Sequence, residues 1–402
     1  MKQRILIAFV LLLVPIASAQ VYTITDLGPL SPTAINIWGQ VVGNLNGKAF
    51  IWTQFSGRKS LGILTGGTSS YAASINDFGV VTGNADGPGT VISQSPFAPN
   101  QECTDLTQPF LWTPKSGMQG LGSVGEVLQY ETYWCEIPFY GTWVNDLGQV
   151  VGYTDVIATY QYGLLWTSAA DMSVYGGSYN PTIVNGISNT GQIVGQNSGV
   201  ILPAIFAHAT SWKRGVATTL EDLSGEANPE YLSSANGVND VGQIVGWSTT
   251  TASEFCSAYA DDPCPMHAVQ WTAGGKISDL GTLPGDAFST ASNINFFGQV
   301  IGSSGNTLGF GAPGTPGGSG FSGQYPITVI GHPFIWSERS GMVDLNTLIS
   351  TSSGWLLNTA TGINIWGQIV GSGTKNGNTH GFLLTPTVFR DQAGRDVNAQ
   401  NQ

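Results

Sequence analysis

The sequence is poor in charge, in cysteine and in long apolar stretches. Only 9% of its 402 residues are charged, and Asp and Glu outnumber Lys and Arg by 25 to 13, for a formal net charge of −12. An acidic chain without a basic cluster argues against nucleic acid and anionic lipid as partners. Its longest apolar run, Ile5 to Ile16, is shorter than a membrane span. We therefore expect no membrane insertion.

This apolar run has the setting of a secretory signal peptide. Lys2 and Arg4 precede it, and Ala17-Ser18-Ala19 follows it as a small-residue cleavage site. We predict a signal peptide over 1–19, cleaved after Ala19, and a secreted or periplasmic mature protein. Loss of the two cations brings the net charge of the mature chain to −14.

Four cysteines in an exported protein predict two disulfides. Cys256 and Cys264 share one loop and form a natural local pair, which leaves Cys103 and Cys135. The spacings do not match those of a zinc site, and no histidine stands at a ligand spacing from a pair. We predict no metal site and no cofactor.

What the sequence does have is a nine-residue pattern that occurs seven times, first as I-N-I-W-G-Q-V-V-G from Ile35 to Gly43. Its Asn can bond its own backbone ahead and its first Gly tolerates positive φ, which favours a type I turn followed by a Gly bulge. The residues after the turn are typical of a strand, and we expect the second Gly to end that strand. The copies span 35–43, 75–83, 144–152, 187–195, 238–246, 294–302 and 363–371.

Around each turn further runs recur, so that one unit reads as four short strands: an approach, the hairpin return, a run ending in Trp and a Leu-Gly run. Successive turns lie 40 or more residues apart, which is typical of propeller blades. We interpret the Trp residues as core between blades. They are Trp52, Trp112, Trp166, Trp212, Trp271 and Trp336, with Leu384 in the seventh place.

The two ends of the chain complement each other. The last unit has no Leu-Gly strand, while an orphan one, Val21 to Leu30, precedes the first unit. Pairing the two would leave no open sheet edge. We predict an all-β fold, a seven-bladed β-propeller of four-stranded blades closed by the N-terminal strand. It would occupy 20–387 as a single domain, followed by a polar tail over 388–402.

The chain resembles the HAF repeat family, described as extracellular repeat proteins of bacteria. The likeness lies in the His-Ala-Phe-like strands, the I-N-x-x-G-Q-V-V-G turns and the D-L-G-T-L runs, and it covers nearly the whole mature chain. Ser188 in the Asn position and Leu384 in the Trp position depart from the pattern. The resemblance implies a repeat protein outside the cell, and it brings no catalytic residues and no defined substrate.

The four histidines all stand four residues before the Trp position. They are His208, His267, His332 and His380. One per blade in the same register indicates a hydrogen-bonding or capping role in a strand. The sequence has no G-x-S-x-G elbow and no Ser/His/Asp grouping that suggests a nucleophile, so we assign no catalytic residue.

The units differ most in their insertions. The connection between the second and third strands is long in three of them, over 84–107, 247–266 and 303–331. In an up-and-down blade this connection lies on the same face as the connections between blades, so we expect these loops to build up one face, with the turns as scaffold on the other. Cys103 and Cys135 would meet there in a disulfide.

We place the candidate ligand-binding residues in these loops. Aromatic faces beside carboxylates suit a glycan, although a loop packed against its own disulfide explains the same residues. Acidic residues of the Cys256–Cys264 loop would help to bind a cation or would simply be solvated. The candidates are Glu131, Tyr133, Trp134, Glu136, Tyr259 and Asp261.

We therefore predict a secreted, non-catalytic propeller that binds an extracellular or cell-surface glycan or protein through the loops of one face. The alternative is a secreted carbohydrate-active enzyme, a hydrolase or lyase, that uses paired carboxylates. A third possibility is a structural repeat protein without a small ligand.

Overall fold

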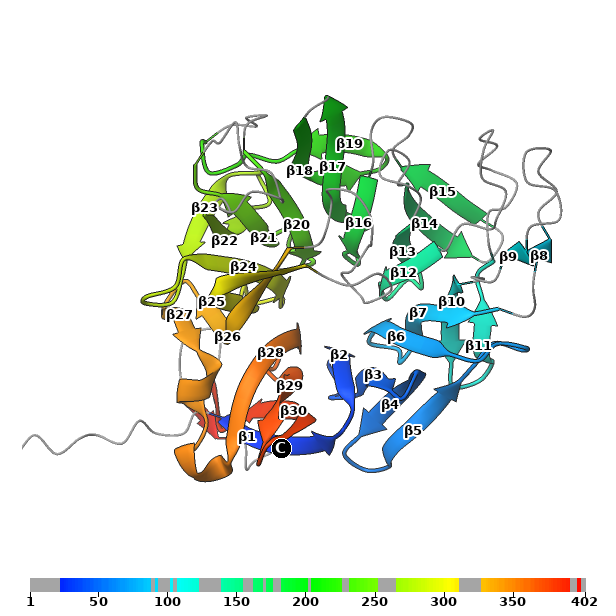
Figure 1. Cartoon of the computed structure of the whole chain (residues 1–402), viewed down its shortest axis with the longest axis horizontal. Coiled ribbons are helices and arrows are strands. Elements are labelled where there is room, and N and C mark those ends of the chain that lie inside the picture. Colours follow the sequence, from blue (N-terminus) through cyan, green and yellow to red (C-terminus); the bar gives the residue numbers. More distant parts are fainter. Residues whose placement is uncertain are drawn as a thin grey trace, which may run out of the picture.

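The protein is a seven-bladed β-propeller, as predicted. Its computed structural model contains seven four-stranded antiparallel sheets arranged in a ring (Figure 1). Among the described residues no helix is long and apolar enough to cross a membrane. The structure describes residues 22–87, 91–92, 102–103, 107–122, 139–154, 162–168, 171–175, 182–201, 204–225, 231–251, 265–310, 327–390 and 396–398.

Each blade is a simple up-and-down meander, and its first strand lies innermost. Blades 1 to 3 consist of β2 (Ser31–Ile35), β3 (Val41–Leu45), β4 (Lys48–Thr53) and β5 (Gly57–Gly62); β6 (Ser70–Ile75), β7 (Val81–Asp86), β10 (Thr107–Thr113) and β11 (Gly117–Gly120); and β12 (Phe139–Val144), β13 (Val150–Thr154), β14 (Gly163–Ser168) and β15 (Asp171–Tyr175).

Blades 4 to 6 repeat this order, and blade 6 is followed by two short 3₁₀ turns, η1 (Leu345–Leu348) and η2 (Thr351–Ser353). Their strands are β16 (Thr182–Ile187), β17 (Ile193–Ile201), β18 (Ala204–Lys213) and β19 (Val216–Thr219); β20 (Ser233–Val238), β21 (Ile244–Thr249), β22 (Met266–Trp271) and β23 (Ile277–Gly281); and β24 (Phe288–Ile294), β25 (Val300–Phe310), β26 (Ile327–Ser337) and β27 (Gly341–Asp344).

Blade 7 closes the ring with the N-terminal strand, as the sequence predicted. β28 (Trp355–Ile363), β29 (Ile369–Lys375) and β30 (Asn378–Pro386) supply three strands, and β1 (Tyr22–Gly28) pairs antiparallel with β30 as the fourth. Asp26 on β1 accepts hydrogen bonds from Lys375 Nζ at 2.8 Å and contacts His380 Nδ1 at 2.9 Å. Burial alone would raise the pKa of Asp26, but these partners and the Gly28 amide lower it.

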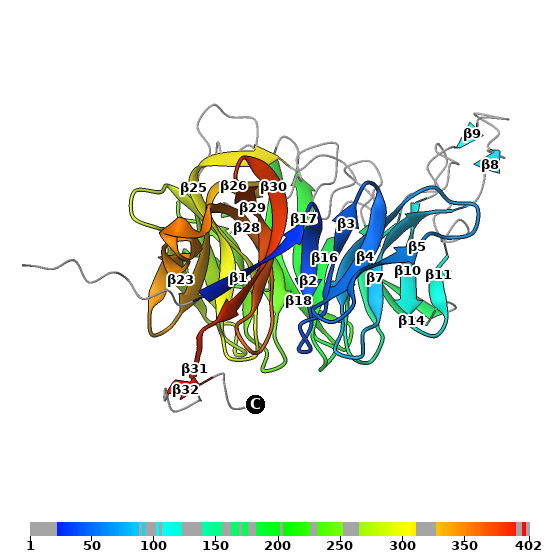
Figure 2. The ribbon, with the colours of Figure 1, turned by 90° about the horizontal axis from the view of Figure 1, so that it is seen from below.

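Two small hairpins lie outside the blades. β8 (Val91–Ile92) pairs with β9 (Glu102–Cys103) within the blade 2 insertion, and β31 (Val388–Arg390) pairs with β32 (Asp396–Asn398) within the C-terminal tail. Seen edge on, the ring is a disc with the first hairpin on one side and the second on the other (Figure 2).

The seven turns have the predicted geometry. In blade 1 the Gly39 amide donates to the Asn36 carbonyl and the Asn36 amide donates to the Gln40 carbonyl, which defines a type I turn with a Gly bulge. Gly39 has φ +70°, which an L-residue adopts only under strain. The Asn36 side chain accepts from the amides of Trp38 and Gln40, as expected for an Asn that starts a turn.

The second Gly of the pattern does not end its strand, contrary to our expectation. β3 continues past Gly43 to Leu45, and β7 continues past Gly83 to Asp86. This Gly lies opposite a bulge in the innermost strand, where an added Cβ would come within 1.8 to 2.4 Å of a backbone carbonyl oxygen in every blade. Close backbone approach therefore requires Gly here.

The apolar core runs between blades. Trp112, Trp166, Trp212 and Trp271 are buried as predicted, and Leu384 takes the same place in blade 7. Trp52 and Trp336 are only partly buried and pack at the margins of their clusters.

Antiparallel strands alternate their connections between the two sides of the disc. The seven turns and the hairpins between third and fourth strands therefore share one side, which we call the turn face. The other side, the insertion face, receives the connections between second and third strands and between blades. Asp86 at the end of β7 illustrates this, since its carboxylate accepts hydrogen bonds from Thr68 and Ser69 in the connection between blades 1 and 2.

Candidate functional site

The seven turns encircle a polar pocket on the axis of the ring. This axial pocket has a volume of about 160 Å³ and is lined by residues of all seven copies of the pattern. The first turn position contributes one polar lining residue from every blade. These residues are Asn36, Asn76, Asn145, Ser188, Asn239, Asn295 and Asn364.

Side chains at this position link each turn to the next. Asn36 Nδ2 donates to the carbonyl of Asn76 at 3.0 Å, and Asn364 Nδ2 donates to the carbonyl of Asn36 at 3.0 Å, so the links continue across the ring closure. Six such links are present, and all seven turns are described. The missing link is from blade 4 to blade 5, because Ser188 bonds Thr190 within its own turn. At that junction the turns are joined instead through the next position, where Asn189 donates to Asp240.

The second turn position divides the mouth of the pocket into a polar and an apolar half. Blades 2 to 5 carry carboxylates and an amide, and their side chains accept from the backbone of the preceding turn; Asp77, for example, accepts from the Ile37 amide at 3.1 Å. Blades 6, 7 and 1 carry apolar residues instead. The polar residues are Asp77, Asp146, Asn189 and Asp240, and the apolar ones are Phe296, Ile365 and Ile37.

We call the four polar residues Asp77, Asp146, Asn189 and Asp240 the acidic arc. Within it, the pKa of Asp77 is shifted upward. Burial raises its pKa, and the charges of Asp146 and Asp240 raise it further, against the lowering effect of the hydrogen bond from the Ile37 amide. Asn189 is neutral, so the arc has one negative charge fewer than it would with a fourth Asp. Its Nδ2 donates to both Asp146 at 2.8 Å and Asp240 at 2.9 Å. These side chains mainly join turns, and they leave oxygen acceptors at the pocket mouth.

The third turn position places large apolar side chains in solvent around the pocket. Thr190 of blade 4 is the exception. The exposed residues are Trp38 (73%), Phe78 (73%), Leu147 (70%), Val241 (48%), Phe297 (53%) and Trp366 (48%). Exposed apolar side chains grouped on one face are characteristic of binding surfaces.

Both tryptophans of this ring are held in place. Trp38 Nε1 donates to the Asp77 carbonyl at 2.8 Å, and Trp366 Nε1 donates to the Ile37 carbonyl at 2.9 Å. Each indole is thus fixed across a blade boundary while its rings remain exposed. Blades 7 and 1 adjoin, so these two indoles are neighbours on the apolar half of the mouth.

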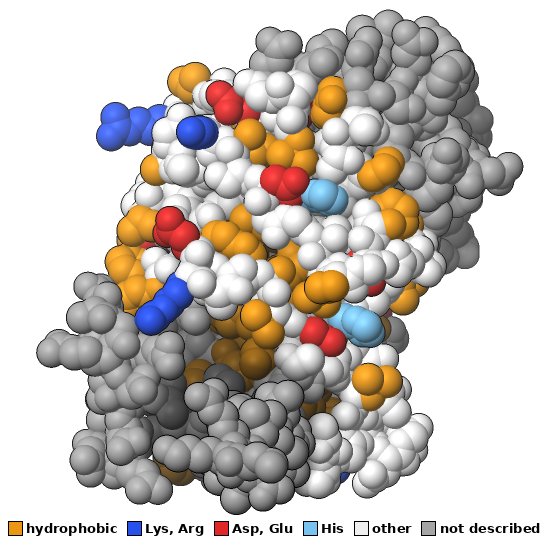
Figure 3. All heavy atoms as spheres, turned by 90° about the vertical axis from the view of Figure 1, so that its left-hand side faces the viewer, with side chains coloured by type: hydrophobic (Ala, Val, Ile, Leu, Met, Phe, Trp, Pro, Cys, Tyr) orange, Lys and Arg blue, Asp and Glu red, His pale blue; other side chains and the backbone are white. Residues whose placement is uncertain are grey.

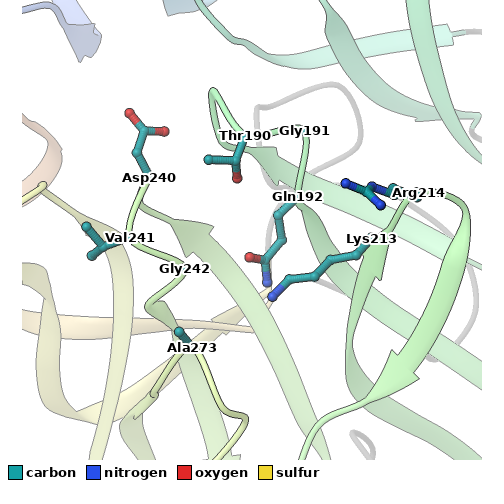
Figure 4. A pocket seen from close by; sticks show the side chains of 9 residues that line it. All are labelled: Thr190, Gly191, Gln192, Lys213, Arg214, Asp240, Val241, Gly242 and Ala273. Atoms are coloured by element: carbon teal, nitrogen blue, oxygen red, sulfur yellow. The ribbon is translucent and has the colours of Figure 1, made fainter.

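A second hollow opens on the turn face between blades 4 and 5. It has a volume of about 500 Å³, and Asp240 lines both this cleft and the axial pocket. Its lining comes from the turns of the two blades and from their hairpins between third and fourth strands (Figure 4). Lys213 and Arg214 supply positive charge on the blade 4 side.

No family model and no curated protein matches the chain, so the resemblance to the HAF repeat family stays a prediction. Among solved structures, the β-propeller domain of the trilobed protease from Pyrococcus furiosus is similar at 8% identity over 93% of this chain and 99% of that one, with a TM-score of 0.47. A chain of a mitotic checkpoint complex matches at 11% identity over 95% and 99%, with a TM-score of 0.43.

The ligand-binding residues predicted from the sequence lie outside the described residues. This holds for Glu131, Tyr133, Trp134, Glu136, Tyr259 and Asp261, and equally for Cys135, Cys256 and Cys264. Cys103 belongs to β9, whose backbone alone is described. The insertion-face site and both disulfides stay predictions.

Two of the four histidines, His267 and His380, have the hydrogen-bonding role that their register predicted, whereas the buried Nδ1 of His208 has no hydrogen-bond partner among the described residues. His267 Nδ1 lies 2.8 Å from Asp279, and His380 Nδ1 lies 2.9 Å from Asp26, so each joins the third strand of a blade to the fourth. Figure 3 shows histidine and carboxylate side chains side by side on the outer wall of the disc. His332 is farther from Asp344, at 3.8 Å. Burial lowers the pKa of His208, and the charge of Asp222 opposes this effect.

The sequence pattern did not predict the ring of exposed side chains, because attention to what the seven turns share hides the positions at which they differ. The turn-starting Asn and the closing Gly recur and are scaffold, but the two positions between them vary from blade to blade. Six of the seven turns have a large apolar residue directly before the turn Gly, a position that normally faces solvent. This feature of the sequence could have located the site.

Proposed function

We propose that the protein is a non-catalytic, exported binding protein that holds a glycan on the turn face, over the axial pocket. The main support for this proposal is the pair of exposed indoles, Trp38 and Trp366, each fixed by a hydrogen bond to the next turn. Aromatic faces offer apolar contact to a sugar ring, and fixed side chains lose little conformational entropy on binding.

The two-sided mouth of the pocket supports a saccharide over a purely apolar partner. A sugar has apolar ring faces and a rim of hydroxyl groups. Trp38, Trp366 and Phe297 would contact the faces. Asp77, beside Trp38, and Asp146 in the next turn would accept hydrogen bonds from hydroxyls. The carboxylates of this arc already bond backbone amides, which favours a binding role over acid–base catalysis.

The proposal is tested by binding of the purified mature protein to oligosaccharides, first on a glycan array and then by calorimetry. Trp38→Ala and Trp366→Ala should each weaken binding about tenfold or more, as expected for a contact residue worth at least about 1.4 kcal/mol. Phe55→Ala is the matched control, because Phe55 is fully exposed on the turn face but lies in an outer hairpin.

Three outcomes would contradict the proposal. Loss of binding in Trp134→Ala but in neither indole variant would move the site to the insertion loops. Capture of a protein through the indoles, with no glycan bound, would change the ligand class. Turnover of a polysaccharide that one Asp or Glu substitution abolishes would establish the enzyme alternative.

A further inference from the structure

The cleft between blades 4 and 5 is lined on its blade 4 side by a short outer hairpin and by a turn with a small side chain. Its outer hairpin has only two residues, Arg214 and Gly215, between the paired Lys213 and Val216. The corresponding hairpin of blade 1 has three residues between Thr53 and Gly57, as do those of blades 2 and 6. The inner turn carries the small Thr190 where the other turns carry apolar side chains. Blade 3 also has a two-residue outer hairpin, between the paired Ser168 and Asp171, so blade 4 is distinguished by the combination of the short hairpin with Thr190.

Two cations line this cleft without a carboxylate partner among the described residues. Lys213 and Arg214 are exposed, and the described ion pairs all involve other cations. The carboxylate that shares the lining, Asp240, accepts from the Asn189 amide at 2.7 Å and from Asn189 Nδ2 at 2.9 Å. Figure 4 shows the Lys213 side chain extending toward that of Gln192, with Arg214 above Lys213 in this view. Gln192 and Thr190 add neutral hydrogen-bonding groups.

We infer that this cleft binds the anionic group, carboxylate or sulfate, of an acidic saccharide. The inference rests on the proposed function, because the same saccharide would lie on the indoles of blades 7 and 1. In a ring of seven blades, the junction of blades 4 and 5 lies across the axis from blade 1. An oligosaccharide crossing the axial pocket would therefore meet the indoles at one end and the two cations at the other, with Asp240 marking the passage between pocket and cleft.

The Lys and Arg residues of the chain gather in the outer hairpins of the face that carries the cleft, outside the acidic residues Asp77, Asp146 and Asp240 at the axial pocket. Seven of the 13 Lys and Arg residues lie at the outer hairpins of the turn face, whereas the connecting segments 88–106, 123–138, 252–264 and 311–326 hold none and contain eight Asp and Glu residues. The cations of the turn face are Arg58, Lys59, Lys115, Lys213, Arg214, Lys276 and Arg339. Although the whole chain is acidic, groups within a Debye length of about 10 Å dominate the attraction of a bound anion.

The test is a double variant built from residues that the chain already uses at matching positions. Lys213→Thr copies Thr53 and Thr113, and Arg214→Asn copies the Asn-Gly hairpins at Asn46 and Asn376, whose φ values of 50° and 49° match the 51° of Arg214. The hairpin should therefore fold unchanged. Lys115→Ser, in the outer hairpin of blade 2, is the matched control for a cation outside the cleft.

Affinities are measured for uronic-acid and sulfated oligosaccharides and for their carboxyl-reduced and desulfated counterparts. The wild type should prefer at least one acidic form about tenfold or more, and the double variant should lose that preference while it keeps the affinity for the neutral form. A preference for the uronic-acid oligosaccharides would identify the anionic group as a carboxylate, and a preference for the sulfated ones would identify it as a sulfate. Equal affinity of the wild type for acidic and neutral forms, or an equal loss of both in the double variant, would overturn the inference.

Binding of free glucuronate and inorganic sulfate, followed by NMR of the Arg214 side chain, separates this inference from the proposed function. A saturable shift that the double variant lacks would support the anion site even if no glycan bound at all. Absence of any shift in the wild type would reject the cleft as an anion site, whatever the indoles bind.

Discussion

At the scale of single residues, Asp77 and Asp86 show how position on the disc sets the pKa of a carboxyl group. Asp77 lies in the acidic arc of the turn face, where burial and its neighbours raise its pKa. Asp86 lies on the insertion face, where hydrogen bonds from Thr68 and Ser69 outweigh burial and lower its pKa to about 2. The two residues should therefore affect the pH dependence of stability with opposite signs.

We expect Asp77→Asn to stabilise the protein at neutral pH. Because the pKa of Asp77 is higher in the folded state, the wild type loses stability as pH rises from the ordinary pKa through the raised one. The Asn side chain avoids this loss and can still accept from the Ile37 amide, as Asn189 does from Asp146. Thermal unfolding should show a higher Tm for the variant at pH 7 and none of the difference near pH 3. A lower Tm at pH 7 would contradict the raised pKa.

We expect Asp86→Asn to destabilise the protein at neutral pH. The lowered pKa means that the ionised carboxylate contributes stability above its ordinary pKa of 3.8, and that this contribution is lost as pH falls through about 2. Urea titrations at pH 7 and at pH 2 test this. The unfolding midpoint of the variant should be lower at pH 7, with the gap closing toward pH 2, and a gap of the same size at both values would argue against the carboxylate as its source.

At the scale of one element, the second Gly of the repeated pattern makes the blade geometry possible. A Cβ on Gly83 would lie 1.8 Å from the Tyr71 carbonyl oxygen, so Gly83→Ala must displace the inner strand. We expect a loss of roughly 3 kcal/mol or more in the free energy of unfolding, measured with denaturant. Gly186→Ala in β16 is the control, because its Cβ would meet nothing closer than 3.6 Å. Comparable losses for both variants would refute the steric explanation.

The same element shows how far the sequence alone could reach. The turn could be predicted because Asn and Gly act on their own local backbone, and the recurrence of the pattern gave the number of blades. The role of Gly83 could not be predicted, since its neighbour Tyr71 belongs to another strand, which bulges between Ala72 and Ser74. The exposed ring at Trp38 and Trp366 likewise depends on which face seven separate turns share. The cleft at Arg214 depends on a hairpin one residue shorter than those of three other blades.

At the scale of the whole molecule, the ring depends on one pair of strands from opposite ends of the chain. We expect deletion of 22–28 to leave β30 as an open edge, to lower the Tm and to promote association between molecules. Size-exclusion chromatography and thermal unfolding measure both effects. Deletion of 388–402, which removes β31 and β32 and no strand of a blade, is the control and should leave both properties unchanged. An unaltered monomer after deletion of 22–28 would show that closure contributes little.

The pairing of β1 with β30 also dictates an order of events during biosynthesis. Asp26 and His380 are 354 residues apart in sequence, yet they are in contact in the finished ring. A ribosome produces β1 first and its partner almost last, so β1 waits unpaired while six blades that need no distant strand can already form. The last blade is thus completed only when the two ends meet. The strand that removes the open edge from the mature propeller is itself an unprotected edge for nearly the whole time that the protein is being made.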